Sequence, residues 1–247
     1  MANYMSGTVT PVNVSARKAG KAIAVGSGPQ AIAVTPIGRT VYLLDWAGGT
    51  VTPIDTATDT AQRPIQVGSF PSAIAISPRD GTAYVANYGS DIVTPIRLAT
   101  ETAGRAIPAG YAPNALAVAP NGKDVYVVDG NTDEVTPFAT ATERAGRVVP
   151  VGYSPVAVTM AASGVTAYVV NSISSTVTPL AATASGRASS PISVGLYSYP
   201  TVLAVTGSTA VVLDTYAGQV SLINTRTRHV FAPERWGNFP VAVAISP

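Results

Sequence analysis

The sequence predicts an all-β fold of repeated, short-stranded antiparallel sheets, and three observations support this class. The pattern Val-Thr-Pro followed by an apolar residue returns with its valines at 9, 51, 93, 135 and 177, and a diverged copy begins at Val220. The period is therefore 42 residues with one single-residue slip. Val, Thr, Ala, Gly and Pro dominate the composition, whereas the helix formers Leu, Glu and Lys are scarce. Short apolar runs alternate with turn residues, which is typical of strands rather than helices.

Each repeat predicts four strands. In the repeat that begins at Pro71, a turn at Gly81 separates the first two strands, Val-Thr-Pro lies in the third, and Gly104 precedes the fourth. Four antiparallel strands per 40 to 45 residues are typical of one blade of a β-propeller, whose radial arrangement protects the sheet edges. The predicted strands of this repeat are 73–76, 82–86, 92–96 and 105–108.

The first strand of each repeat alternates small and large apolar side chains, as in Ala115, Leu116, Ala117 and Val118. A nearly continuous apolar strand is expected to be buried on both faces. Alternating sizes suit strands that interdigitate with those of neighbouring blades. We therefore expect the first strand to be buried on both faces and to lie nearest the axis.

The proline of the third strand conflicts with the strand prediction, because proline has no N–H for the ladder and is confined to edges and bulges. We expect a bulge or a locally missing hydrogen bond at this position.

Six prolines precede the first strands, at 29, 71, 113, 155, 200 and 240. They predict six blades in one domain covering residues 1–247. The first strand of the sixth repeat ends at Pro247, and residues 1–25 supply a third and a fourth strand. We therefore expect the two termini to share the closing blade. The alternative is a piece cut from a longer protein with a larger ring.

Tyr84-Val85-Ala86-Asn87 and Tyr168-Val169-Val170-Asn171, with a Gly-x-x-Pro turn before the first strand, carry a family resemblance. The repeat resembles the YVTN-type β-propeller repeat of bacterial and archaeal surface-layer-like proteins. The resemblance implies a secreted or surface-associated binding or structural module, and relatives often have seven blades. The chain departs from the pattern at the proline of Val-Thr-Pro and in the fifth repeat, where Val211 replaces the tyrosine.

Composition excludes several classes of protein. Charged residues are 11% of the chain and the net charge is +2, which argues against a nucleic-acid partner. Without cysteine there is no disulfide, thiolate nucleophile or thiolate metal site. No apolar run approaches the ~18 residues of a membrane span, so we expect no membrane insertion. The N-terminus lacks the basic and apolar regions of a signal peptide.

The predicted topology sorts the loops onto two faces. The top face, with the loops before the first strand and after the second, is expected to be aromatic and acidic and to lack Lys and Arg; the bottom face is expected to be basic. Aromatic rings near carboxylates suit a carbohydrate, peptide, small-molecule or cationic ligand. Packing over the adjacent proline is the alternative for these rings. The predicted ligand-binding residues are Trp46, Phe70, Tyr88, Tyr111, Tyr153, Tyr197, Tyr199, Tyr216 and Phe239.

Asp or Asn recurs after the second strand, at 45, 87, 129, 171 and 214, and we expect these residues to turn their own loops by local hydrogen bonds. Asp129, Asn131 and Asp133 resemble the first half of a calcium loop, but Glu134 stands where glycine is needed, so we prefer a plain turn. The single histidine, His229, lies among arginines and is expected to be solvated.

The sequence favours a non-catalytic binding or structural module without a cofactor, extracellular or on the cell surface. The first alternative is a lyase or lactone hydrolase that uses carboxylates of the top face with a divalent cation such as calcium. The second is a scaffold that associates with copies of itself. The sequence does not identify the ligand.

Overall fold

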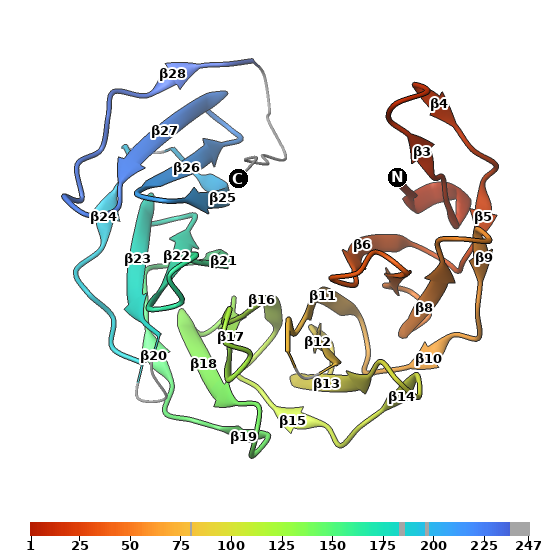
Figure 1. Cartoon of the computed structure of the whole chain (residues 1–247). Coiled ribbons are helices and arrows are strands. Elements are labelled where there is room, and N and C mark those ends of the chain that lie inside the picture. The colour runs from red at the N-terminus through yellow and green to blue at the C-terminus, as the bar shows by residue number, and fades with distance from the viewer. Residues whose placement is uncertain (80, 183–185, 196–197, 238–247) are drawn as a thin grey trace. The chain divides into compact units, whose positions relative to one another are not determined.

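Each repeat folds into one antiparallel sheet whose strands follow their order in the chain (Figure 1). The computed structural model describes residues 1–79, 81–182, 186–195 and 198–237. The chain divides into two compact units, Met1–Pro108 and Ala109–Pro247. Each unit is described by itself. The predicted all-β class is confirmed in the described residues.

Three six- or seven-residue strands form the body of every complete sheet. The first strands are β6 (Pro29–Val34), β11 (Pro71–Ile76), β16 (Pro113–Val118), β21 (Pro155–Met160) and β25 (Pro200–Thr206). The second strands are β7 (Thr40–Asp45), β12 (Thr82–Asn87), β17 (Asp124–Asp129), β22 (Thr166–Asn171) and β26 (Thr209–Asp214). The third strands are β8 (Thr50–Asp55), β13 (Ile92–Arg97), β18 (Glu134–Ala139), β23 (Thr176–Ala181) and β27 (Gln219–Asn224).

The fourth strand is short and, in three sheets, split into two pieces that both pair with the third strand. These pieces are β9 (Thr60–Ala61), β10 (Ile65–Gln66), β14 (Thr102–Ala103), β15 (Ile107–Pro108), β19 (Arg144–Ala145) and β20 (Val149–Pro150). The last two sheets have single short fourth strands, β24 (Ile192–Ser193) and β28 (Glu234–Arg235).

The N-terminal residues form a partial sheet, β1-β2-β5, beside a small hairpin. Its segments are β1 (Ala2–Asn3), the 3₁₀ turn η1 (Tyr4–Ser6), β2 (Thr8–Val9), β3 (Val12–Asn13), β4 (Lys18–Ala19) and β5 (Ile23–Ala24). The predicted first strand of the sixth repeat, residues 240–247, lies outside the described residues. The shared closing blade therefore stays a prediction.

The split fourth strand accommodates the proline of the third. Pro95 lies opposite Tyr84 in an unbroken register, so of the two predicted alternatives the bulge does not occur in this strand. The edge of Pro95 that faces the fourth strand falls between β14 and β15, where no ladder N–H is needed. The carbonyl of Pro95 accepts a hydrogen bond from the N–H of Gly104 at 2.7 Å. The predicted local gap in the ladder is therefore confirmed. The register shifts occur in the first strands instead, as between Pro71 and Ala73.

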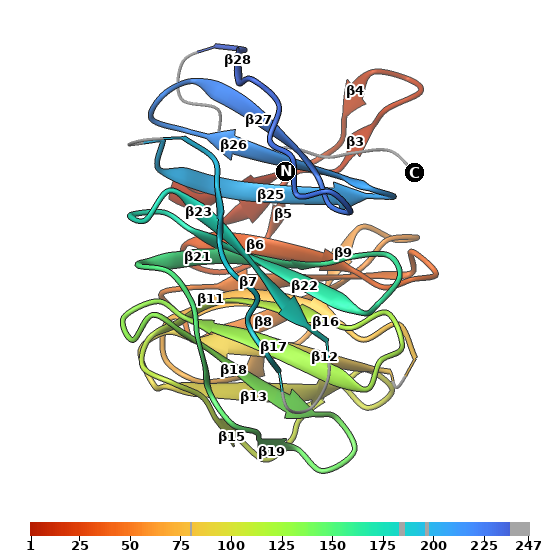
Figure 2. The ribbon, with the colours of Figure 1, turned by 90° about the vertical axis from the view of Figure 1, so that its left-hand side faces the viewer.

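The hydrophobic core of each unit lies between neighbouring sheets. In the first unit Tyr42, Leu44 and Val51 of one sheet meet Val85 and Ile96 of the next. Equivalent clusters join the sheets of the second unit, which follow one another as layers (Figure 2). Within each unit, neighbouring sheets therefore share one hydrophobic core.

The first strands are less buried than predicted. First strands of successive sheets do contact one another within each unit, as β6 does with β11 and β16 with β21. However, most of their side chains are only half-buried, and Val34 is exposed. The physical reason is that each first strand ends its sheet and is flanked by a partner on one side only. The second and third strands carry the core. Among the described residues, no helical segment has the length and hydropathy of a transmembrane span.

Candidate functional site at the loop end of the sheets

Two loops of each sheet are bonded into one layer, which we call the loop end: the loop before the first strand and the loop after the second. In the sheet that begins with β11, Tyr88 N–H donates to the carbonyl of Phe70 and Gly89 N–H to that of Ser69, both at 3.0 Å. Trp46 N–H donates in the same way to Gly28. Each sheet thus brings together the two loops that the sequence placed on its top face.

A buried Asp or Asn at the end of each second strand holds this layer from below. The Asn87 amide donates to the carbonyl of Ile92 and to the Thr94 hydroxyl, and its Oδ1 accepts the N–H of Gly68 at 2.9 Å. Asn171 bonds Thr178 equivalently, and Asp129 accepts from Thr136. In the sheets that begin with β11, β16 and β21, the Thr of Val-Thr-Pro is therefore a partner of this buried group. The bonds to the following loop agree with the local role expected from the sequence.

The same buried side chain explains the glycine of the Gly-x-x-Pro turn. A Cβ at Gly152 would lie 2.8 Å from both Cβ and Cγ of Asn171, and one at Gly68 would lie 2.7 Å from the same atoms of Asn87. Real Cβ atoms essentially never approach other atoms so closely. A side chain at this position would have to displace the buried group.

Burial shifts the pKa of two of the acidic members. Asp214 is fully buried, and burial raises the pKa of its carboxyl to about 6, although the nearby Ser198 hydroxyl opposes the rise. Burial likewise raises the pKa of Asp45, against hydrogen bonds from Ser27, Thr50 and Gly48 that lower it. Both side chains are buried, so their carboxyls are not presented to a ligand.

The aromatic residues of the first unit gather at its loop end. The ring centroid of Trp46 lies 5.2 Å from that of Phe70 and 5.9 Å from that of Tyr88, with both pairs tilted. Phe70 and Tyr88 are 48% and 39% exposed, so the cluster is accessible. Beside it is a hollow of about 210 Å³. The sequence predicted these residues but not their contact.

The aromatic residues of the second unit are divided. Tyr199 and Tyr216 make an edge-to-face pair at 5.8 Å beside an open hollow of about 480 Å³ that Thr201 and Thr215 also line. Tyr111 and Tyr153 are 60% and 66% exposed. The other two predicted aromatic residues, Tyr197 and Phe239, lie outside the described residues.

The residues of the calcium-like segment do not turn toward one point. Asp129 is buried and bonded to Thr136 at 2.5 Å, whereas Asp133 accepts the N–H of Ser154 at 2.7 Å. Asn131 is exposed. Over the described ranges, no three His, Cys, Asp or Glu side chains are grouped as a metal site would require.

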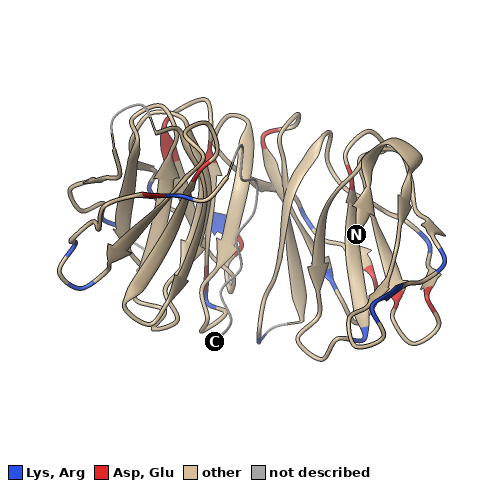
Figure 3. Ribbon diagram, turned by 90° about the horizontal axis from the view of Figure 1, so that it is seen from above, with Lys and Arg blue, Asp and Glu red and all other residues tan. Residues whose placement is uncertain are grey.

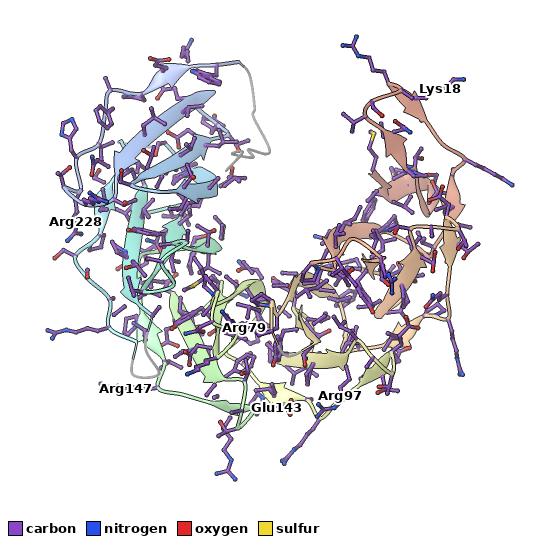
Figure 4. The ribbon with its side chains drawn as sticks, in the orientation of Figure 1. Lys18, Arg79, Arg97, Glu143, Arg147 and Arg228 are labelled. Atoms are coloured by element: carbon purple, nitrogen blue, oxygen red, sulfur yellow. The ribbon has the colours of Figure 1, made fainter. Side chains whose placement is uncertain are left out.

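The charge distribution agrees only in part with the predicted separation. Arg97 ends β13 opposite Thr82, the far end of the sheet from Asn87. In the unit that contains the N-terminus, Lys and Arg lie mainly toward one end of the sheets together with several acids (Figure 3). Arg97, Glu143 and Arg147 lie on the outer-strand side of their own sheets (Figure 4).

The sequence missed two residues at the loop end. Arg235, in β28, pairs with Gln219, which is itself opposite Asp214, so an arginine lies beside the loops that were predicted to lack Lys and Arg. Its neighbour Trp236 is 72% exposed. Trp236 directly precedes Gly237 of the last Gly-x-x-Pro sequence, and this position in the repeat could have identified it as a residue of the loop end. His229 is exposed, as predicted, with its ring against Phe231.

Comparison with known proteins assigns the family. Residues 18–194 match the family described as Lactonase, 7-bladed beta-propeller, and the chain belongs to this family. This assignment confirms the propeller prediction but not the surface-layer-like family. No curated protein matches the chain.

Solved structures share the fold at low sequence identity. A hydrazine synthase of Kuenenia stuttgartiensis aligns with a TM-score of 0.84 at 20% identity, over 97% of this chain and 83% of that one. A putative 6-phosphogluconolactonase of Bacteroides uniformis aligns with 0.78 at 14% identity, over 97% and 81%. The periplasmic gluconolactonase PpgL of Pseudomonas aeruginosa aligns with 0.72 at 16% identity, over 92% and 76%. At such identities the likeness concerns the fold alone.

We expect Gly152→Ala to destabilise the protein by about 1–3 kcal/mol, because the added methyl overpacks the site against Asn171. Urea unfolding measures the change. Tyr153→Ala, the neighbouring exposed position, is the control and should change the free energy of unfolding by less than about 0.5 kcal/mol. Equal stability of Gly152→Ala and wild type would contradict the packing explanation.

We expect Asp214→Asn to stabilise the protein at pH 8 by at most about 3 kcal/mol, the equivalent of its pKa shift. The folded pKa of about 6 exceeds the unfolded value of 3.8. The contribution of Asp214 is therefore complete below pH 3.8 and is lost as the pH rises through 6. The variant should lack this loss when urea unfolding is followed from pH 4 to pH 8.

The reverse change at the equivalent position, Asn171→Asp, is the matched control. It places a carboxyl where the amide donates to Thr178, so stability should acquire a new decline as the pH rises. If neither variant altered the pH profile, burial would not control these carboxyls.

Proposed function

We propose that the chain hydrolyses the ring ester of a sugar-acid lactone. The observation that carries this proposal is its membership of the lactonase family. The gluconolactonase titles of two similar structures support it further. Exposed aromatic rings at the loop end, with polar groups beside them, suit a small ring-shaped substrate. The lactone hydrolase is thus preferred here over the non-catalytic module favoured by the sequence.

The reaction needs a group that takes a proton from water. Water adds to the lactone carbonyl carbon, the bond from that carbon to the ring oxygen breaks, and the departing oxygen receives a proton, which gives the open hydroxy acid. A carboxylate can act as the general base. Asp45, Asp129 and Asp214 are buried and therefore do not reach a substrate.

Asp91 and Asp133 are the better candidates because both are partly exposed in the turn just before a third strand. They share a left-handed backbone, with φ of 56° and 58°. Asp91 lies in the turn that also carries Tyr88, a member of the aromatic cluster of the first unit, whereas Asp133 belongs to the second unit. We assign the general base to Asp91. A divalent cation, calcium included, remains part of the lactone hydrolase alternative predicted from the sequence.

A second candidate function is binding without turnover. The observation that favours it is the contact of the Trp46 ring with those of Phe70 and Tyr88, whereas no three His, Cys, Asp or Glu side chains in the described part of the chain are grouped as a metal site requires. Under this alternative the same loop end would hold a carbohydrate, peptide or small molecule unchanged. The six-bladed ring, the extracellular or cell-surface location and self-association stay predictions from the sequence.

We expect the purified protein to open glucono-δ-lactone faster than the spontaneous reaction, measured as acid release with a pH indicator. Heat-denatured protein provides the background. Asp91→Asn should lower kcat by about 100-fold or more, the usual contribution of a general base, while Asp133→Asn should leave it within a few fold.

The same assay tests the metal and the rival function. A rate that EDTA abolishes and calcium restores would place a cation in the reaction. A rate equal to the background over several aldonolactones, with saturable binding of the lactone, would favour the binding module and reject the hydrolase.

A further inference from the structure

We infer that the aromatic cluster of the first unit and the hollow beside it form a binding subsite for one neutral, unphosphorylated sugar ring. This inference rests on the proposed function, because it names the substrate class that the same loop end would accept. It is argued from the first unit alone.

The rings form a fixed platform. The Phe70 ring packs over Gly89, where a Cβ would lie 3.3 Å from its Cγ and nearer still to its Cδ2. The Tyr88 N–H holds the Phe70 carbonyl, and the Ser69 N–H donates to the Ser90 hydroxyl at 3.1 Å. Since both loops are also bonded to Asn87, the platform is in place before a ligand arrives, which reduces the ordering cost of binding.

The hollow beside the platform supplies hydrogen-bonding groups. Gln66 extends into this region from β10 and donates through Nε2 to the carbonyl of Gly49 at 2.8 Å. A few placed polar groups beside aromatic walls are typical of small-molecule sites. The lining comprises Phe70, Gln66, Ser69, Gly48, Gly49 and Gly68, with Ala47 at its edge.

The chemistry of this lining selects a sugar. The C–H bonds on one face of a pyranose are slightly positive and meet the negative face of an aromatic ring, while its hydroxyls need amide, hydroxyl and backbone partners. The glycines let the ligand approach the backbone closely. No residue of the lining carries a charge, so the hollow lacks the Arg or Lys that would pair with a phosphate.

The hollow of the second unit fits this chemistry less well. The Thr201 and Thr215 hydroxyls that line it are hydrogen-bonded to each other, and its aromatic residues are two tyrosines. The subsite is assigned to the first unit because Trp46, Phe70 and Tyr88 are clustered beside its hollow. Trp236 of the second unit is not among the residues that line the hollow there.

The test uses the two tryptophans of the chain, Trp46 and Trp236. In Trp236→Phe, Trp46 is the sole indole fluorophore. We expect its emission to change saturably on titration with methyl β-D-glucopyranoside, a stable ring without an ester, and not with glucose 6-phosphate in the same range. Trp46→Phe, which keeps Trp236, should show no saturable change.

Variants in the Trp236→Phe background locate the ligand. Phe70→Ala and Gln66→Ala should each weaken binding by about 10-fold or more, while Phe70→Tyr retains it and Ile173→Ala, at an exposed position of the other unit, has no effect. Circular dichroism melting confirms that each variant is folded. The inference is overturned if Trp46 does not respond, if Phe70→Ala and Gln66→Ala bind as well as their parent, or if glucose 6-phosphate binds equally well.

The outcome for the subsite is separable from that for the hydrolase. Lactone hydrolysis without any Trp46 response would reject the subsite and leave the hydrolase standing. A Trp46 response that Phe70→Ala removes, without hydrolysis of any lactone, would support the subsite as a binding site and reject the hydrolase. If both hold, Phe70→Ala should raise KM and leave kcat within a few fold.

Discussion

The loop end depends on one buried polar group per sheet, the Asp or Asn that ends the second strand. Asn87 satisfies its amide within its own strands and accepts the N–H of Gly68 from the loop before the first strand. A buried polar group that loses its partner costs about 1–3 kcal/mol. The two loops of a sheet are therefore not independent, because moving either one breaks bonds to the same fully buried side chain.

This constraint determines which residues can be varied. The glycine of Gly-x-x-Pro is fixed because a Cβ would collide with the buried group. The residue just before the proline adopts a left-handed backbone at Phe70, Ala112, Ser154 and Tyr199, with φ between 48° and 56°. Left-handed conformations are unfavourable for non-glycine residues and persist only where the surroundings impose them. The bonds from the following loop impose it here, so the side chain at this position has a fixed direction whatever its type.

The sequence predicted the strands well, because a strict period of 42 residues with turn residues between apolar runs leaves few alternatives. Its predictions were less accurate where local structure depends on a partner strand that is missing or interrupted. The bulge expected at Pro95 is unnecessary because the fourth strand is interrupted beside it, and the first strands are half-exposed because each ends its sheet. The sequence also identified the aromatic residues but not their contacts. Trp46 and Phe70 come from loops of successive sheets, and whether their rings meet depends on how those sheets stack, which no local pattern encodes.

The same framework explains how members of one family can differ in function without differing in fold. Phe70 and Tyr199 carry rings where Ala112 and Ser154 carry none, yet all four residues share one backbone conformation. Replacing a side chain there alters the surface offered to a ligand and leaves the buried Asn87-type junction unchanged. The buried acids serve the framework, since their carboxyls are not presented to a ligand. Under the proposed function, specificity would reside in the exposed pre-proline and post-strand positions. There the first unit presents Trp46 beside a hollow whose lining is uncharged and rich in glycine.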